Sequence, residues 1–157
     1  MQRRSMSRIS SLAVPFAIVC AMLASGVSAQ ADSGDKKGCS NQTLNGNYGS
    51  RADGWLLPAP GVSLPFRALT MTHFDGRGNI SWVEHTVING TLVGPDWSTT
   101  ASGTYDVNPD CTGTATVNTP NSPVPLVLGM VIVKNGNEVD TVLDSHAIIS
   151  VFNKVDQ

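Results

Sequence analysis

Apolar and polar residues alternate along most of the chain after Cys39, and short turn sequences separate the alternating runs. Alternation with a period of two is the pattern of strands with one buried face, and no long run keeps apolar residues at helical spacing. The sequence therefore predicts an all-β domain. Its expected strands are 44–50, 66–74, 79–89, 99–107, 111–118, 126–134, 137–143 and 147–155.

The clearest predicted hairpin joins the strands 126–134 and 137–143. Its turn, Asn135-Gly136, is the pair that favours a type I′ turn, because both residues accept a positive φ. A register centred there makes one face almost entirely apolar, so turn chemistry and hydrophobic pattern agree. The register pairs Ile132 with Val139, Met130 with Thr141, and Leu128 with Leu143.

A second hairpin is predicted around Asp75-Gly76, taken as a two-residue turn. This register places Met71 opposite Ile80, Leu69 opposite Trp82, and Arg67 opposite Glu84. Two interpretations of the last pair remain open. It is a solvated ion pair worth ~0 to 1 kcal/mol, or it is a polar site within an apolar barrel interior.

A third turn, Asn108-Pro109-Asp110, has the residues of a type I turn and joins the strands 99–107 and 111–118. Small residues dominate one shared face of these two strands. They allow either a close approach of the two sheet segments or room for a ligand. The residues of that face are Ala101, Gly103, Tyr105, Val107, Cys111, Gly113, Ala115 and Val117.

Eight antiparallel strands with mostly short connections predict an up-and-down β-barrel, which leaves no exposed sheet edge. A β-sandwich is the alternative architecture. The longer loops, 58–61 and 119–123, leave too few residues beyond them for a second core. We therefore expect one domain, residues 39–157.

The first 31 residues have the pattern of a signal peptide. Arg3, Arg4 and Arg8 precede an uncharged stretch, 9–27, and small residues then allow cleavage after Ala29 or Ala31. A retained membrane anchor is the alternative, although this stretch lies at the short end for a span. Residues 32–38 are polar and are expected to be a flexible leader to the barrel. The sequence thus predicts export to the periplasm or the medium, with no membrane span after cleavage.

Composition narrows the classes of partner. Only 14% of the 157 residues are charged, and the formal net charge is -2. Removal of the three early arginines would leave seven basic and twelve acidic side chains. Nucleic-acid surfaces need clustered Lys and Arg, so we expect no nucleic-acid partner.

Two cysteines, Cys39 and Cys111, remain after the predicted cleavage. An even pair in an exported chain predicts a disulfide. The alternative, a catalytic or metal-binding thiol, lacks the close Cys or His spacing that such sites use.

Three segments together resemble a group of small exported bacterial proteins, most of them uncharacterised. They are 44–49 (Leu-Asn-Gly-Asn-Tyr-Gly), 74–80 (Phe-Asp-Gly-Arg-Gly-Asn-Ile) and 103–113 (Gly-Thr-Tyr-Asp-Val-Asn-Pro-Asp-Cys-Thr-Gly). The resemblance implies a calycin-like barrel, similar to the allene oxide cyclase and lipocalin architectures. It implies no chemistry, because no cyclase catalytic residue has a counterpart here and the lipocalin Gly-x-Trp motif is replaced by adjacent Gly54-Trp55. The shared residues are turns, glycines and the cysteine.

The chain offers few candidates for chemistry. In the predicted register His73 and His85 lie on opposite faces, so these two and His146 should not converge on a metal, and we expect neither metal nor cofactor. Glu84 and His85 are neighbours on one strand and point to opposite faces, so they cannot serve one substrate atom.

Three hypotheses of function follow. We favour a non-catalytic barrel that binds a small apolar ligand, because apolar cavities with a few polar groups are the usual ligand sites. Its candidate binding residues are Arg67, Glu84, Trp82 and Tyr105. The alternatives are an isomerase-like enzyme on a cyclase-type barrel, with Glu84 as acid and base, and a structural or surface-interaction protein with a solid barrel.

Overall fold

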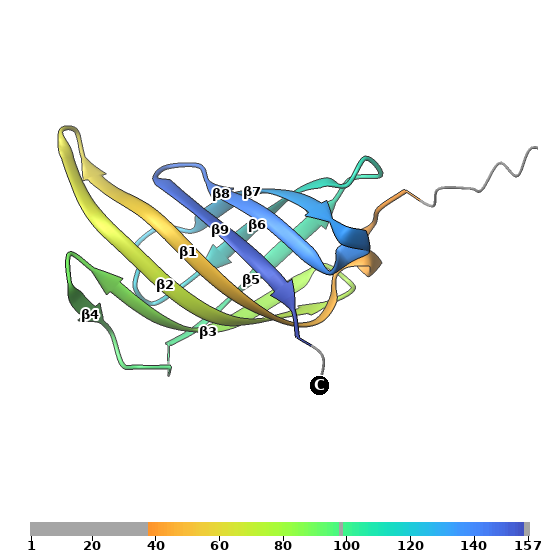
Figure 1. Ribbon diagram of the computed structural model, residues 1–157, viewed down its shortest axis with the longest axis horizontal. Helices are drawn as coiled ribbons and strands as arrows, with labels where there is room; N and C mark the ends of the chain where they lie inside the picture. The colour runs from red at the N-terminus through yellow and green to blue at the C-terminus, as the bar shows by residue number, and fades with distance from the viewer. Residues whose placement is uncertain (1–37, 98, 156–157) are drawn as a thin grey trace, which may run out of the picture. The chain divides into compact units, whose positions relative to one another are not determined.

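The computed structural model describes residues 38–97 and 99–155 of the chain (Figure 1). The predicted signal peptide, 1–31, and nearly all of the predicted flexible leader, 32–38, lie outside these residues. Within the described part, no helix has the length and apolar character needed to cross a membrane.

The described chain is built from nine strands and two short 3-10 helices. The predicted strands are all present, and one further short strand, β4, follows β3. In chain order the elements are η1 (Asn41–Thr43), β1 (Asn45–Ala59), β2 (Val62–Asp75), β3 (Asn79–Ile88), β4 (Thr91–Val93), β5 (Thr99–Val107), β6 (Thr112–Asn118), β7 (Leu126–Val133), η2 (Lys134–Gly136), β8 (Glu138–Leu143) and β9 (Ala147–Lys154).

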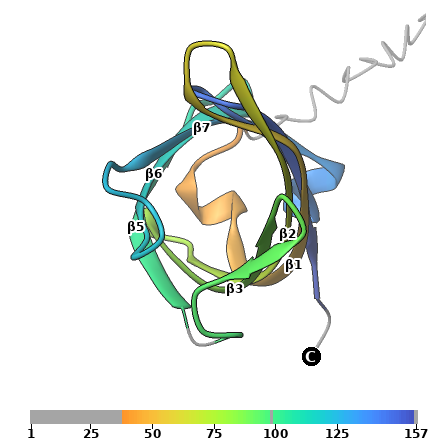
Figure 2. The same ribbon diagram turned by 90° about the vertical axis from the view of Figure 1, so that its left-hand side faces the viewer.

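Eight of these strands close into an antiparallel barrel. Each pairs with the next barrel strand along the chain, and β9 returns to pair with β1. Strand β4 lies outside the ring and pairs only with β3 among the described strands. Figure 2 shows the ring end-on. The predicted up-and-down barrel is confirmed, and the structure is not a sandwich.

Side chains alternate between the interior and the outer wall along most of the barrel strands. Along β6, for example, each second residue is buried, beginning with Gly113 and ending with Val117. In β3 the inward positions are Ile80, Trp82, Glu84 and Thr86. The period-two pattern of the sequence therefore reports directly which side chains face the barrel interior.

The β7–β8 hairpin has the predicted register. Leu128 pairs with Leu143, Met130 with Thr141, and Ile132 with Val139. The turn residues Asn135 and Gly136 have φ values of 56° and 84°, as a type I′ turn requires.

The predicted register of the β2–β3 hairpin is wrong by three residues. Ile80 pairs with Phe74, Trp82 with Thr72, and Glu84 with Thr70. The turn is longer than two residues because the Asp75 carboxylate accepts hydrogen bonds from the backbone N–H groups of Arg77 and Asn79, at 2.7 and 2.9 Å. Asp and Asn side chains commonly replace backbone pairing in this way.

Strands β1 and β2 are longer than predicted. Their pairing continues to Ala59 and Val62, which reduces the expected loop 58–61 to a tight turn at Pro60-Gly61. The sequence did not show this extension because Trp55, Leu56 and Leu57 are consecutive apolar residues that break the alternation. The resulting hairpin projects past the other strands at one end of the barrel (Figure 1).

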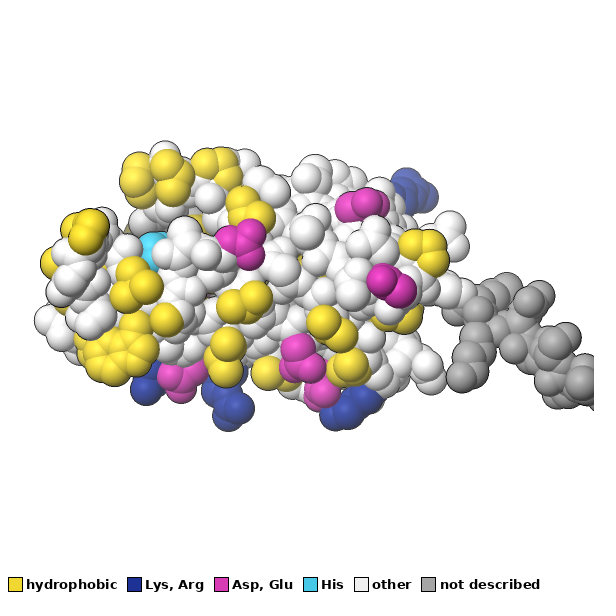
Figure 3. Space-filling model, turned by 90° about the horizontal axis from the view of Figure 1, so that it is seen from above, with side chains coloured by type: hydrophobic (Ala, Val, Ile, Leu, Met, Phe, Trp, Pro, Cys, Tyr) yellow, Lys and Arg dark blue, Asp and Glu magenta, His cyan; other side chains and the backbone are white. Residues whose placement is uncertain are grey.

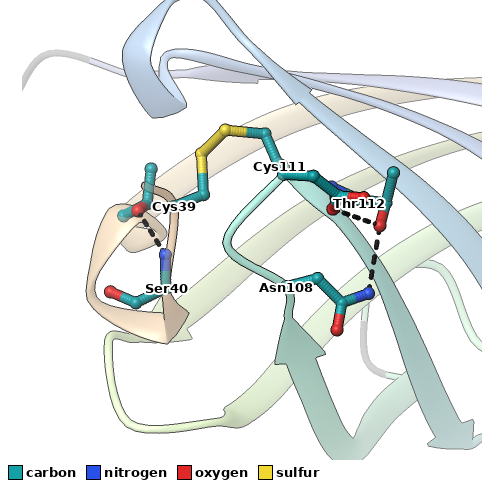
Figure 4. The surroundings of a disulfide bond; sticks show 7 residues. Cys39, Ser40, Asn108, Cys111 and Thr112 are labelled. Atoms are coloured by element: carbon teal, nitrogen blue, oxygen red, sulfur yellow. Dashed lines mark hydrogen bonds between the residues drawn. A yellow bond between two sulfur atoms is a disulfide. The ribbon is translucent and has the colours of Figure 1, made fainter. Parts of the chain in front are cut away.

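The opposite end of the barrel is closed. The predicted disulfide links Cys39, just before η1, to Cys111 at the β5–β6 turn, with 4.9 Å between the Cα atoms (Figure 4). Beneath η1, the Phe74 ring makes edge contacts with Tyr48 and Tyr105, each at 5.1 Å between ring centroids. This aromatic cluster fills the interior at the closed end.

Small residues on β5 and β6 serve close strand approach. A Cβ atom added to Gly103 would lie 1.9 Å from the backbone oxygen of Thr116 on β6. One added to Gly113 would lie 2.5 Å from that of Asp106. Of the two uses that the sequence allowed for these glycines, the structure shows the first.

Candidate functional site

A cavity of about 400 Å³ opens at the end of the barrel opposite the disulfide. Its walls come from β1, β2, β3 and β4 on one side, and from the β6–β7 and β8–β9 connections on the other. The lining is mostly apolar, and Figure 3 shows hydrophobic side chains gathered at this end. Apolar lining residues include Leu56, Phe66, Ile88, Val93, Leu126 and Ile148.

A smaller chamber of about 70 Å³ continues into the barrel from this cavity. The two share five wall residues, among them Phe66, Glu84 and Ile148. Ser50 and Thr70 also line the smaller chamber, and their hydroxyls are 2.7 Å apart in a hydrogen bond. Both chambers therefore have mostly apolar walls with a few polar groups, and the hydroxyls of Ser50 and Thr70 lie in the wall of the inner one.

Glu84 lies where the two chambers meet and is only 9% exposed. Its Oε2 accepts a hydrogen bond from the indole N–H of Trp82 at 3.0 Å. Its Oε1 accepts one from the Asn121 amide at 2.8 Å and one from the Thr119 hydroxyl at 3.3 Å. The carboxylate is therefore held by one strand neighbour and by the β6–β7 loop.

Thr86 lies two residues beyond Glu84 on the same inward face of β3 and lines the larger chamber. It is 4% exposed, and its hydroxyl has no hydrogen-bond partner in the described part of the chain. A buried hydroxyl without a partner costs about 1 to 3 kcal/mol. Such groups are rare in native structures, and each calls for an explanation.

Of the four predicted binding residues, the structure brings Glu84 and Trp82 together in the interior. Arg67 does not join them, because the corrected register places it opposite Val87 rather than Glu84. Its guanidinium lies on the outer wall, 61% exposed, and pairs with Asp53 at 2.5 Å. The predicted Arg67–Glu84 pair is absent.

Tyr105 is also remote from the cavity. It belongs to the aromatic cluster at the closed end, where its hydroxyl donates to the backbone oxygens of Asn41 and Leu44, both at 2.9 Å. Burial raises its pKa, and the same cause raises the pKa of Tyr48. Both hydroxyls thus remain protonated donors at neutral pH.

The three histidines lie apart, although not for the predicted reason. In the corrected register, His73 and His85 point to the same outer face rather than to opposite faces. His73 contacts Asn47 there, and His85 contacts Asp96. His146 lies instead at the cavity mouth, where its Nδ1 accepts the backbone N–H of Leu57 at 3.1 Å.

Sequence reasoning missed three polar residues of the site. Thr86 could have been found, because it continues the inward alternation that contains Trp82 and Glu84. Thr119 and Asn121 carry no such signal, because they belong to a loop with no periodic pattern.

Comparison with known proteins adds no relative from which chemistry could be transferred. No family model, curated protein or solved structure matches this chain. The resemblance drawn from the three sequence segments therefore stays a prediction, and the interpretation of this cavity depends on its own geometry.

Proposed function

We propose that this protein is a non-catalytic barrel that binds a small, largely apolar molecule in its open end. The observation that carries the proposal is the cavity of about 400 Å³, walled by apolar side chains around one buried carboxylate. Ligand sites typically measure about 300 to 1,000 Å³ and combine apolar walls with a few placed polar groups. An eight-stranded barrel of this kind can hold one small ligand.

Two further features support this function. A cup closed at one end agrees with the calycin-like relationship that the sequence resemblance implies, since lipocalins are eight-stranded up-and-down barrels. The disulfide suits an oxidising compartment, in agreement with action in the periplasm or the medium after export.

The isomerase alternative depends on Glu84, which faces the interior as that hypothesis requires. Acid–base catalysis needs groups within hydrogen-bond reach of one substrate position. Among the described residues, Glu84 is the one carboxyl group that lines the two chambers. His146, the other titratable side chain of this lining among the described residues, accepts a backbone N–H at the mouth. We therefore favour binding over turnover.

The proposal is tested by blocking the cavity on its most peripheral strand. Val93 on β4 lines the cavity, whereas its neighbour Leu92 does not and is 44% exposed. We expect the fluorescent apolar probe N-phenyl-1-naphthylamine to bind the unaltered protein and the Leu92→Trp variant. Val93→Trp should weaken binding at least tenfold, because the indole would occupy the mouth.

Absence of probe binding to the unaltered protein, or equal binding by the two tryptophan variants, would contradict a ligand site in this cavity. Both substitutions lie outside the closed ring, so the melting temperature should change little in either.

A further inference from the structure

The buried carboxylate of Glu84 has no cationic partner. Within the described residues, the salt bridges join other acids, and no Lys or Arg lines either chamber. A charge removed from water is strongly unfavourable unless it is paired or fully hydrogen-bonded. The walls of the cavity thus carry a charge that this part of the chain does not balance.

The hydrogen bonds to Glu84 leave part of its acceptor capacity unused. The Trp82 indole has only a donor to offer, so Oε2 acts as an acceptor there. Oε1 accepts two hydrogen bonds, whereas Oε2 accepts one, and each carboxylate oxygen has two lone pairs. One acceptor position therefore remains on Oε2.

Thr86 supplies a second unused polar group beside the first. Two residues along a strand are separated by about 6.6 Å, and their side chains share a face. The unpartnered Thr86 hydroxyl consequently lies on the same wall as Glu84, although its Oγ1 is shielded from solvent. A change between staggered χ1 rotamers turns a threonine hydroxyl by about 120°, which would direct Oγ1 toward the cavity. An ammonium group has three N–H donors, enough to bond both Oε2 of Glu84 and Oγ1 of Thr86 in that rotamer.

We propose that the ligand is an amphiphilic amine, with its ammonium group bound by Glu84 and Thr86 and its apolar part directed toward the mouth. The inference rests on the proposed function and specifies the ligand class for the same cavity. The orientation follows from the volumes: Glu84 lies where the chambers meet, and the outer chamber of about 400 Å³ has room for the apolar part, whereas the inner one measures only about 70 Å³. A ligand cation would balance this carboxylate, which is only 9% exposed.

The test compares four ten-carbon competitors that differ in head group: decylamine, decyltrimethylammonium, decanol and decanoate. Each displaces N-phenyl-1-naphthylamine from the unaltered protein, below its micelle-forming concentration and at low ionic strength. We expect decylamine to bind at least tenfold more tightly than decanol, and decanoate to bind most weakly. Decyltrimethylammonium should fall between decylamine and decanol, because it carries the charge without N–H donors.

Two substitutions test which side chains cause the preference for decylamine. Glu84→Gln should remove the advantage of decylamine over decanol and leave decanol binding unchanged within about twofold. Thr86→Val should lower decylamine affinity about three- to tenfold without lowering the melting temperature, because the lost hydroxyl has no partner. Thr72→Val is the matched control: Thr72 is fully buried and hydrogen-bonded to Thr70 at 2.8 Å, so its loss should destabilise the fold and leave the head-group ranking unchanged.

The two proposals fail differently. If the probe does not bind, the proposed function is wrong. If the probe binds but decanol or decanoate equals decylamine, the cavity binds apolar molecules and the amine inference is wrong. A Glu84→Gln variant that only melts earlier, with the ranking preserved, would mean that Glu84 merely anchors the β6–β7 loop. The ranking in the unaltered protein decides the matter even if that variant does not fold.

Discussion

The disulfide should supply a large part of the stability of this barrel. The bridge joins Cys39 and Cys111, which are 72 positions apart in the sequence. By the loop-entropy relation, such a closure stabilises the folded state by roughly 4 kcal/mol. In a domain of about 120 residues, 1 kcal/mol corresponds to roughly 3 to 5 °C. Replacing both cysteines by serine should therefore lower the melting temperature by about 12 to 20 °C.

The assay is thermal and urea unfolding followed by circular dichroism, and the first control compares the unaltered protein with and without reductant. A second control changes the residue at position 111 to glycine, because Cys111 has a φ of 68°, in the left-handed region. Glycine adopts this region without steric cost, whereas other residues pay about 1 to 2 kcal/mol. Cys39→Ser with Cys111→Gly should thus be about 1 kcal/mol more stable than the double serine variant.

Probe binding provides an independent check, because the bridge lies at the closed end and contributes nothing to the cavity walls. The double serine variant should bind N-phenyl-1-naphthylamine normally at temperatures where it is folded. Two free thiols in the native protein, or a loss below about 1 kcal/mol in the double variant, would refute the argument.

Three other predictions concern the scaffold. Gly103→Ala should destabilise the barrel by about 1 to 3 kcal/mol or more, because the added Cβ would overlap a backbone oxygen of β6. Gly129→Ala should be tolerated, since the atom nearest to its added Cβ would be 3.6 Å away. Urea unfolding of the two variants tests this difference. Tyr105→Phe removes the hydroxyl that donates to the backbone oxygens of Asn41 and Leu44, of which the first keeps the Leu44 N–H as a donor, and should cost about 1 to 3 kcal/mol in the same assay. Hydrogen bonds from Asn79 lower the pKa of Asp75 to about 2. The stabilisation by this carboxylate is therefore present above pH 4 and lost as the pH falls toward 2. Asp75→Asn should reduce the dependence of the melting temperature on pH in this range, and an unchanged dependence would contradict the prediction.

The sequence predicts the barrel well because local and long-range signals coincide in it. At Asn135-Gly136 the turn chemistry and the alternation both require the same register, and the structure has it. At Asp75-Gly76 the turn was read from the backbone preference alone. The Asp75 side chain lengthens that turn through its own hydrogen bonds, and this shifted the pairing by three residues.

The candidate site was only partly predictable for a related reason. Glu84 and Trp82 could be proposed as an acid and an aromatic residue on one strand of the expected barrel. Their hydrogen-bond partner Asn121 comes from a loop 37 residues away in sequence, and only the folded structure brings it to the carboxylate. Arg67 was assigned to the interior because the predicted register was wrong. Tyr105 was assigned to the ligand site because its side chain faces inward, but the sequence does not show which end of the barrel is closed.

The most direct test of an open, ligand-binding interior is a methyl NMR titration, because two adjacent isoleucines report on opposite sides of the barrel wall. Ile148 is 4% exposed and lines the cavity, whereas Ile149 is 62% exposed on the outer wall. With decylamine bound, we expect intermolecular nuclear Overhauser effects between the alkyl chain and the methyl groups of Ile148, and none to Ile149. Contacts to Ile149 alone, with the Ile148 signals unmoved, would contradict the account.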